Sequence, residues 1–147
     1  EVLVYPLNFN LDNSLNSKGL IEGKVHHGGL MDSTMILSKP ALIKDFGFPE
    51  GENVGVHEFA HLIDKDDGSI DGIPAVLDKT ERQIWATLVA KELKSKPKHF
   101  KMDAYGYLNE EEFFAVLMEM YREKESDVAK KFPELYVVLK ENFSNPN

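Results

Sequence analysis

Hydrophobic residues in about the first fifty positions occur in short runs that turn-forming residues interrupt. Val2–Tyr5 is a β-branched and aromatic run that stops at Pro6, and Thr34–Ser38 is an apolar run that ends before Pro40. Turns that contain Asn and Gly separate the two runs. Short runs of this composition are typical of strands, so the pattern predicts a small N-terminal β-sheet.

Helical spacing replaces this pattern in the rest of the chain. It predicts one helix over about 53–64 and a second that begins near Asp78, with Glu81 completing a capping box, and stops before Pro97. A third begins at Asn109 and a fourth enters at Pro133. The apolar stripe of the third helix is Phe113, Val116, Leu117 and Met120. Because strands come first and helices follow, we expect an α+β fold.

Composition and charge narrow the classes of protein. The chain has 147 residues, is 42% hydrophobic and carries a formal net charge of -8, which favours a single globular domain over residues 1–147. Its length also allows a sizeable core. No apolar run reaches the roughly 18 residues that a membrane-spanning helix needs. The acidic balance argues against nucleic acid as a partner, and the lysine run over 91–101 is typical of a solvated loop. With no cysteine, disulfides and thiolate zinc sites are excluded.

The stretch with the clearest chemistry is an H-E-x-x-H pattern, His57–His61, inside the first predicted helix. Residues four apart differ by about 40° around a helix, so both imidazoles can reach one metal ion. Glu58 is turned by about 100° from His57, which places it where it can take a proton from a metal-bound water. Neutral imidazoles favour zinc. The competing interpretation is a helix whose two histidines only make packing or surface contacts.

A catalytic zinc site needs a third protein ligand, and the residues leave more than one candidate. The extended H-E-x-x-H-x-x-G-x-x-H pattern is excluded, because Asp64 and Asp67 stand at the positions of its Gly and last His. Glu112 and Glu119 lie about two turns apart on the helix that starts at Asn109. Glu119 is placed to support the ligands from behind, and Asp64 could do the same. Alternatively, Asn109-x-x-Glu112 is a capping box that explains Glu112 by helix stability alone.

Tyr105 lies in an irregular segment seven residues before Glu112. A tyrosine at this place can donate its hydroxyl to a developing oxyanion. On its own the signal is weak, since most tyrosines serve packing.

Three segments together resemble the Mlc titration factor A family of zinc metallopeptidases, which are glucose-regulated. They are His57–Asp64, Asp71–Pro74 and Asn109–Val116, with supporting matches at Glu1–Pro6, Ile36–Ser38 and Pro133–Tyr136. The resemblance covers nearly the whole chain. The segment Tyr105–Phe114 is also similar to the Tyr-Gly-x-x-Asn-Glu-x-Glu-Phe-Phe motif in the catalytic domain of anthrax lethal factor.

The resemblance implies a zincin-like metallopeptidase with one zinc ion per chain. His57, His61 and Glu112 would be the zinc ligands, Glu58 the general base and Tyr105 the stabiliser of the oxyanion. It also implies that Met35–Ser38 is the strand at the edge of the substrate cleft.

By the same resemblance, the protein is expected to be a cytoplasmic peptidase, with aminopeptidase activity in at least some members. The alternative is a zinc-bearing regulatory protein that sequesters a transcriptional repressor and whose peptidase activity is incidental. The chain is shorter than typical members, and we expect that it lacks their upstream helical segment.

Overall fold

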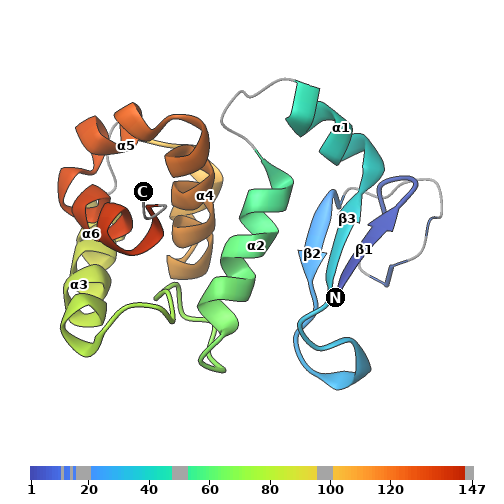
Figure 1. The fold of residues 1–147 in the computed structure, drawn as a ribbon, viewed down its shortest axis with the longest axis horizontal. Helices are drawn as coiled ribbons and strands as arrows, with labels where there is room; N and C mark the ends of the chain where they lie inside the picture. The colour runs from blue at the N-terminus through green and yellow to red at the C-terminus, as the bar shows by residue number, and fades with distance from the viewer. Residues whose placement is uncertain (11, 14, 16–20, 48–52, 96–100, 145–147) are drawn as a thin grey trace.

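The computed structural model describes residues 1–10, 12, 13, 15, 21–47, 53–95 and 101–144. The strands are β1 (Val2–Tyr5), β2 (Gly23–Val25) and β3 (Met35–Ser38). The helices are α1 (Lys39–Gly47), α2 (Val54–Lys65), α3 (Lys79–Ser95), α4 (Glu110–Glu123), α5 (Glu125–Lys131) and α6 (Pro133–Phe143), with short 3₁₀ turns η1 (Gly29–Met31) and η2 (Ala104–Tyr107). The strands come first and most helices follow, so the α+β prediction is confirmed (Figure 1).

The three strands form one sheet in the order β1-β3-β2. β1 runs parallel to β3, with Val2 opposite Met35, and β2 runs antiparallel to β3, with Gly23 opposite Leu37. All four residues of β3 are buried, and β3 has a strand partner on each side. The expectation that Met35–Ser38 is the strand at the cleft edge is therefore wrong. Among the described residues, the strand at the edge of the sheet next to α2 is β2.

The predicted helix starts agree with the caps that form. Asn53 accepts a hydrogen bond from the Val56 N–H through its side chain at 2.9 Å, at the start of α2. The capping box of α3 is complete, since Asp78 Oδ1 accepts from the Glu81 N–H and Glu81 Oε2 accepts from the Asp78 N–H. Pro133 occupies the first turn of α6.

Two short helices have no counterpart among the predictions. α1 follows β3 directly, although Pro40 suggested only the end of a strand. Proline is tolerated in the first turn of a helix, where the backbone N–H has no intrahelical partner. The Ser38 hydroxyl accepts a hydrogen bond from the Ala41 N–H at 3.2 Å and so helps to start the helix. α5 has seven residues and lacks a side-chain cap, so its sequence carries little local signal.

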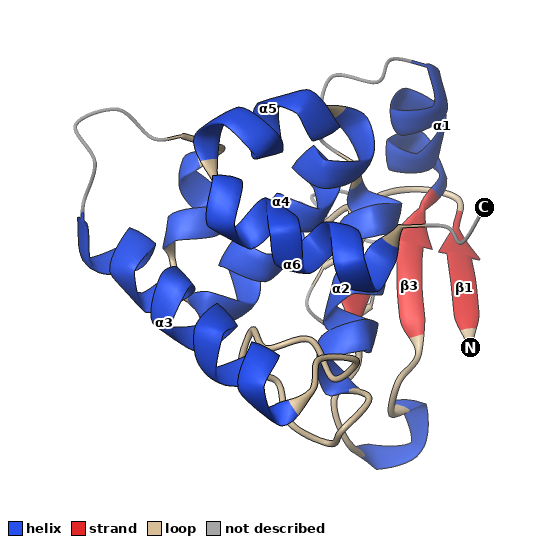
Figure 2. Ribbon diagram, turned by 60° about the vertical axis from the view of Figure 1, so that its left-hand side comes forward, coloured by secondary structure: helices blue, strands red, loops and turns tan. Residues whose placement is uncertain are grey.

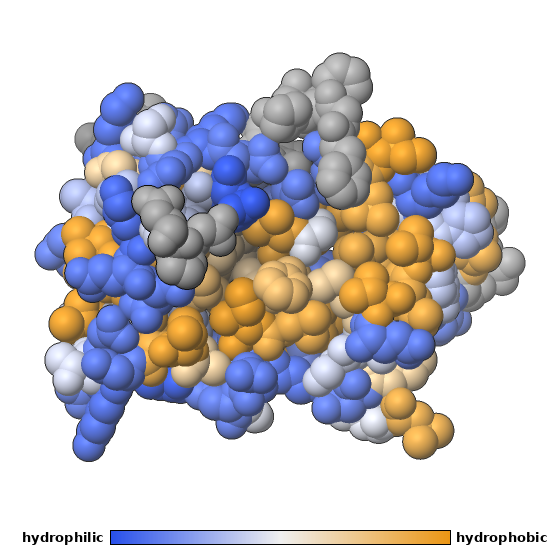
Figure 3. All heavy atoms as spheres, viewed as in Figure 1, coloured by the Kyte–Doolittle hydropathy of each residue, from blue (hydrophilic) through white to orange (hydrophobic). Residues whose placement is uncertain are grey.

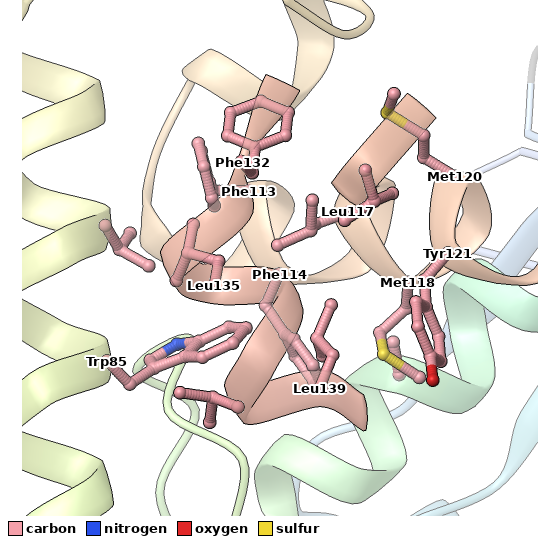
Figure 4. Close-up of a cluster of buried hydrophobic side chains, with 14 of the residues drawn as sticks. Trp85, Phe113, Phe114, Leu117, Met118, Met120, Tyr121, Phe132, Leu135 and Leu139 are labelled. Atoms are coloured by element: carbon pink, nitrogen blue, oxygen red, sulfur yellow. The ribbon is translucent and has the colours of Figure 1, made fainter. Parts of the chain in front are cut away.

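Helix α4 forms the centre of the main core. Nine consecutive residues, from Phe113 to Tyr121, are buried, rather than the single stripe that the spacing predicted. A helix that is buried on every side must have neighbours all round, and the cluster around it includes Trp85 of α3 and Leu139 of α6 (Figure 4). The second view shows α4 among the other helices, with the sheet at one side (Figure 2).

Helix α2 lies between the helical part and the sheet (Figure 1). In the space-filling view from the same side, hydrophobic side chains gather across the middle of this face (Figure 3). A groove of about 820 Å³ there includes Val56, Phe59 and Ile63 of α2 in its lining. Among the described residues, none of the helices combines the length and the hydropathy that a membrane crossing requires.

Candidate metal centre

Two helices bring the predicted ligands together. His57 and His61 project from one face of α2, and Glu112 lies in the first turn of α4, which packs against α2. The two imidazole Nε2 atoms are 3.2 Å apart, and Glu112 Oε2 lies 3.0 Å from His57 Nε2 and 3.7 Å from His61 Nε2. Ligand atoms of all three residues lie within 4.8 Å of one another. This separation is typical of donors that share one ion.

The capping interpretation of Glu112 accounts for its backbone but not for its side chain. Its N–H donates to Asn109 Oδ1 at 2.8 Å, as a helix cap requires. Its carboxylate faces the histidines instead of returning to the Asn109 backbone, and Oε1 accepts a hydrogen bond from the Tyr105 hydroxyl at 3.1 Å. Asn109 therefore caps α4, while the carboxylate of Glu112 points into the centre.

Glu119 lies behind His57, as its two-turn spacing from Glu112 suggested. His57 Nδ1 donates to Glu119 Oε1 at 2.6 Å, and Glu119 Oε2 accepts from the Asn53 N–H at 2.7 Å. A proton on Nδ1 leaves the lone pair of Nε2 directed at the centre. The same carboxylate thus orients a ligand ring and holds the N-terminus of α2.

The donor set fits a metal ion. Glu112 Oε2 is buried and has no hydrogen-bond partner among the described residues, despite its 3.0 Å contact with His57 Nε2. Buried polar atoms without a partner are rare in folded proteins and call for one. Two imidazole nitrogens and a carboxylate oxygen facing one another are three lone-pair donors, which a cation would satisfy together.

The pKa values of His57 and Glu112 depend on the charges around them. Burial acts to lower the pKa of His57, but contacts with Glu112 and Glu119 outweigh it and raise this pKa to about 10. Burial acts to raise the pKa of Glu112, but the adjacent rings of His57 and His61 bring it down to about 2. The carboxylates of Glu112 and Glu119 therefore favour positive charge at the middle of the centre, which either a second proton on His57 or a metal ion that displaces this proton can supply.

Glu58 lies beside the ligands but points towards the sheet. It is 7% exposed and accepts a hydrogen bond from the backbone N–H of Val25 in β2. Burial raises the pKa of Glu58, while His57 and His61 partly offset this effect. Tyr105 is half exposed, and burial together with Glu112 raises its pKa to about 12, so its hydroxyl keeps its proton.

Asp64 does not support the centre directly. Its carboxylate accepts hydrogen bonds from the N–H groups of Gly72 at 2.9 Å and Ile73 at 3.1 Å, and it is completely buried. It therefore fastens the loop after α2, which in turn contacts α3 through the bond from Trp85 Nε1 to the Gly72 carbonyl at 2.7 Å. The Asp71–Pro74 segment has a structural role in this network.

Sequence reasoning missed two residues near the centre. Asp45 of α1 is buried and accepts from the Val54 N–H at 2.8 Å, so a second carboxylate holds the start of α2. Gly23 of β2 lies against Glu58. Neither residue belongs to a local motif, because each acts on a partner more than eight positions away in the chain.

A cavity of about 460 Å³ opens beside the centre. Its lining includes His57, Glu58 and Tyr105, together with Ile21–Gly23 at the edge of the sheet. His26 and His27 do not line it. The centre is therefore reached from a space that is bounded on one side by β2.

Comparison with known proteins agrees with this geometry. Residues 1–144 match the family model described as Glucose-regulated metallo-peptidase M90. The chain is also 30% identical over 154 aligned residues to the uncharacterized protein slr2042 of Synechocystis sp.. That alignment covers 97% of this chain and 56% of the relative, so the chain spans little more than half of the relative's length.

Proposed function

Because the chain belongs to the glucose-regulated metallopeptidase family, we propose that it is a zinc-dependent peptidase whose active site is the centre on α2 and α4. The observation that supports this proposal most is the convergence of His57, His61 and Glu112, with donor atoms within 4.8 Å of one another. Two imidazoles and one carboxylate match catalytic zinc sites, which use three protein ligands and leave a position open.

Zinc in this position would polarise the scissile carbonyl and lower the pKa of water towards about 7. The chain's own residues supply the remaining chemistry. Hydrolysis adds water across the peptide C–N bond, so a proton has to move from the water to the leaving nitrogen. Glu58 is the general base that takes this proton and then delivers it to the amine. Its raised pKa, caused first by burial, suits a group that both accepts and returns a proton.

Tyr105 would stabilise the negative charge that develops on the carbonyl oxygen. Its hydroxyl carries a proton, lies at the cavity and donates to Glu112 Oε1 at 3.1 Å. A neutral donor at this place favours the oxyanion over the uncharged carbonyl, which is the difference that lowers the barrier.

The open edge of β2 offers a place for the substrate backbone. The Glu22 carbonyl accepts a hydrogen bond from the Ser38 N–H in β3, and the His26 N–H donates to the carbonyl of Thr34, just before β3. In the alternating pattern, the backbone groups of Gly23 therefore point away from β3. An extended peptide can add to such an edge as a further strand. In this arrangement, β2 replaces Met35–Ser38 as the strand that receives the substrate.

The test is hydrolysis of quenched fluorescent peptides by the zinc-loaded parent and by Glu58→Gln. A peptide pair with free and acetylated N-termini distinguishes aminopeptidase from endopeptidase action. We expect Glu58→Gln to bind zinc like the parent and to lose about 10²- to 10⁴-fold in kcat. Glu141→Gln, an exposed position on α6, is the matched control and should cleave like the parent. Equal turnover in Glu58→Gln and the parent would refute the mechanism.

A further inference from the structure

Gly23 lies where the open edge of the sheet meets the proposed general base. A Cβ atom at this position would lie 2.7 Å from Glu58 Cγ and 3.0 Å from Glu58 Oε1. It would also lie 2.5 Å from Val54 Cγ2. Carbon atoms in folded proteins do not pack at such distances, because the repulsion rises steeply below van der Waals contact. Any side chain at position 23 must therefore displace its neighbours.

The backbone conformation gives no other reason for glycine here. Among the described residues, the glycines with positive φ are Gly28, Gly29, Gly68 and Gly72, and Gly23 is not one of them. An alanine could adopt the backbone angles of Gly23, as it can in any ordinary strand. Glycine is required at this position by the space that Glu58 and Val54 occupy.

Glu58 has little freedom to move aside. It is 7% exposed, and its carboxylate accepts a hydrogen bond from the Val25 N–H, two residues along the same strand. Val54, one turn earlier on α2, closes the space that an added methyl group would need. β2 therefore determines the position of Glu58 in two ways. The backbone N–H of Val25 donates to its carboxylate, and Gly23, which has no side chain, leaves the space that Glu58 occupies.

We propose that Gly23 is a positioning residue for catalysis. Because Gly23 has no side chain, Glu58 can occupy the position from which Glu58 transfers the proton. This inference rests on the proposed function, in which Glu58 is the base. A methyl group at position 23 displaces the Glu58 carboxylate and leaves the proposed zinc ligands, which project from a neighbouring face of α2, in place. A misplacement of about 1 Å is enough to cost about 10²-fold in rate.

The experiment is a double-mutant cycle on the zinc-loaded protein with Gly23→Ala, Glu58→Gln and the combination. Gly23→Ala should keep zinc at the parental ratio, lower kcat by about 10²-fold and change KM little. In the Glu58→Gln background the same substitution should change kcat by less than about twofold, since the base is already absent. Lys24→Ala is the control in the same strand, because its side chain points to the opposite face.

A second cycle uses stability of the metal-free protein and no activity at all. Gly23→Ala should lower the urea midpoint in the parent, and by less than half as much when Val54 and Glu58 are both replaced by alanine, because Val54 Cγ2 and the Glu58 atoms that the new methyl group strikes are then gone. If Gly23→Ala alone fails to fold, Val54→Ala removes the nearest contact. The double variant that combines Gly23→Ala with Val54→Ala should then fold and bind zinc. Its kcat should still be lower than that of the parent, whereas Val54→Ala alone should have the parental kcat.

The possible results distinguish the positioning role of Gly23 from the proposed peptidase function. Parental kcat in Gly23→Ala, or losses that add fully in the two cycles, would overturn the positioning role while leaving the peptidase intact. Parental kcat in Glu58→Gln would instead overturn the proposed base.

Discussion

The two sides of helix α2 are built differently. On the helical side, sixteen buried residues of the described part of the chain form one continuous cluster around α4. On the sheet side, the buried cluster consists of Val25, Met35 and Leu37, with a few partly buried neighbours. Since burial of apolar surface is the main source of stability, α2 is anchored mostly from the helical side.

The two sides of α2 therefore have different roles: the helical side carries the proposed metal ligands, and the sheet side forms a wall of the cleft. The proposed ligands and their support, Glu119, belong to α2 and α4 and so rest on the large core. The wall opposite them comes from β2, a strand of three residues with one neighbour. We therefore expect substitutions on the helical side to reduce stability and metal binding, and substitutions at β2 to change turnover first.

The largest effect on stability should come from the helical core. Phe113→Ala removes a completely buried ring at the centre of α4 and should lower the free energy of unfolding by about 3–5 kcal/mol. Val25→Ala, in the sheet cluster, should lower it by about 1.5–3 kcal/mol. Urea unfolding of both variants measures the difference. Equal losses of unfolding free energy in the two variants would show that the two sides of α2 contribute equally to stability.

Next in size is the loop that fastens α2 to α4. Gly72 has a φ of 73°, and a Cβ there would lie 2.3 Å from backbone atoms of Glu110. Gly72→Ala therefore combines backbone strain with a collision that no side chain can relieve, and should cost about 2–5 kcal/mol. Gly68→Ala is the matched control: its φ is 90°, but nothing lies within 4 Å, so only about 1–2 kcal/mol of strain applies. Similar unfolding midpoints for the two variants would contradict the role of the Glu110 contact.

A smaller effect is expected at the support of the ligand. In Glu119→Gln, the amide has one acceptor oxygen and cannot accept from both His57 and Asn53 as the carboxylate does. Zinc affinity should fall by about 10- to 100-fold. Competition with a chromophoric chelator measures this loss, and Glu110→Gln, an exposed position on the same helix, is the control. Unchanged affinity in Glu119→Gln would show that the orientation of His57 does not depend on this carboxylate.

The smallest effect belongs to the surface of the helical side. Arg82 forms an ion pair with Asp67, and hydrogen bonds from Ser69 together with this pair lower the pKa of Asp67 to about 2. Arg82→Gln should cost less than about 1 kcal/mol, and the cost should shrink in high salt. Because the pKa is depressed, this contribution is present above about pH 4 and is lost as the pH falls towards 2. A loss of several kcal/mol would mean that surface charge, rather than the core, holds this side.

Local chemistry explains what could be predicted from the sequence. The caps at Asn53, Asp78 and Asn109 act within one turn, and the histidine spacing fixes two ligands on one face of α2. The seven-residue interval put Glu112 and Glu119 on one face of α4, which predicted that Glu119 lies behind the metal ligands. Each of these features depends on residues close together in the chain.

The remaining features depend on partners far apart in the chain. Nothing near Met35–Ser38 shows that β1 pairs with it in parallel and so makes it a central strand. Gly23 and Asp45 reach the centre only through contacts with α2, and the choice between cap and ligand for Glu112 depends on α2 lying against α4. Tertiary packing determines these relations, and the local sequence does not encode them.

The central claim is that α2 and α4 hold one metal ion between them. Elemental analysis of the parent, Glu112→Ala and Glu110→Ala, prepared identically without added zinc, tests it most directly. Glu110 lies in the same first turn of α4 and is exposed, so it matches Glu112 in its effect on the helix. We expect about one zinc per chain in the parent and in Glu110→Ala, and much less in Glu112→Ala. Equal zinc in Glu112→Ala and the parent would contradict it.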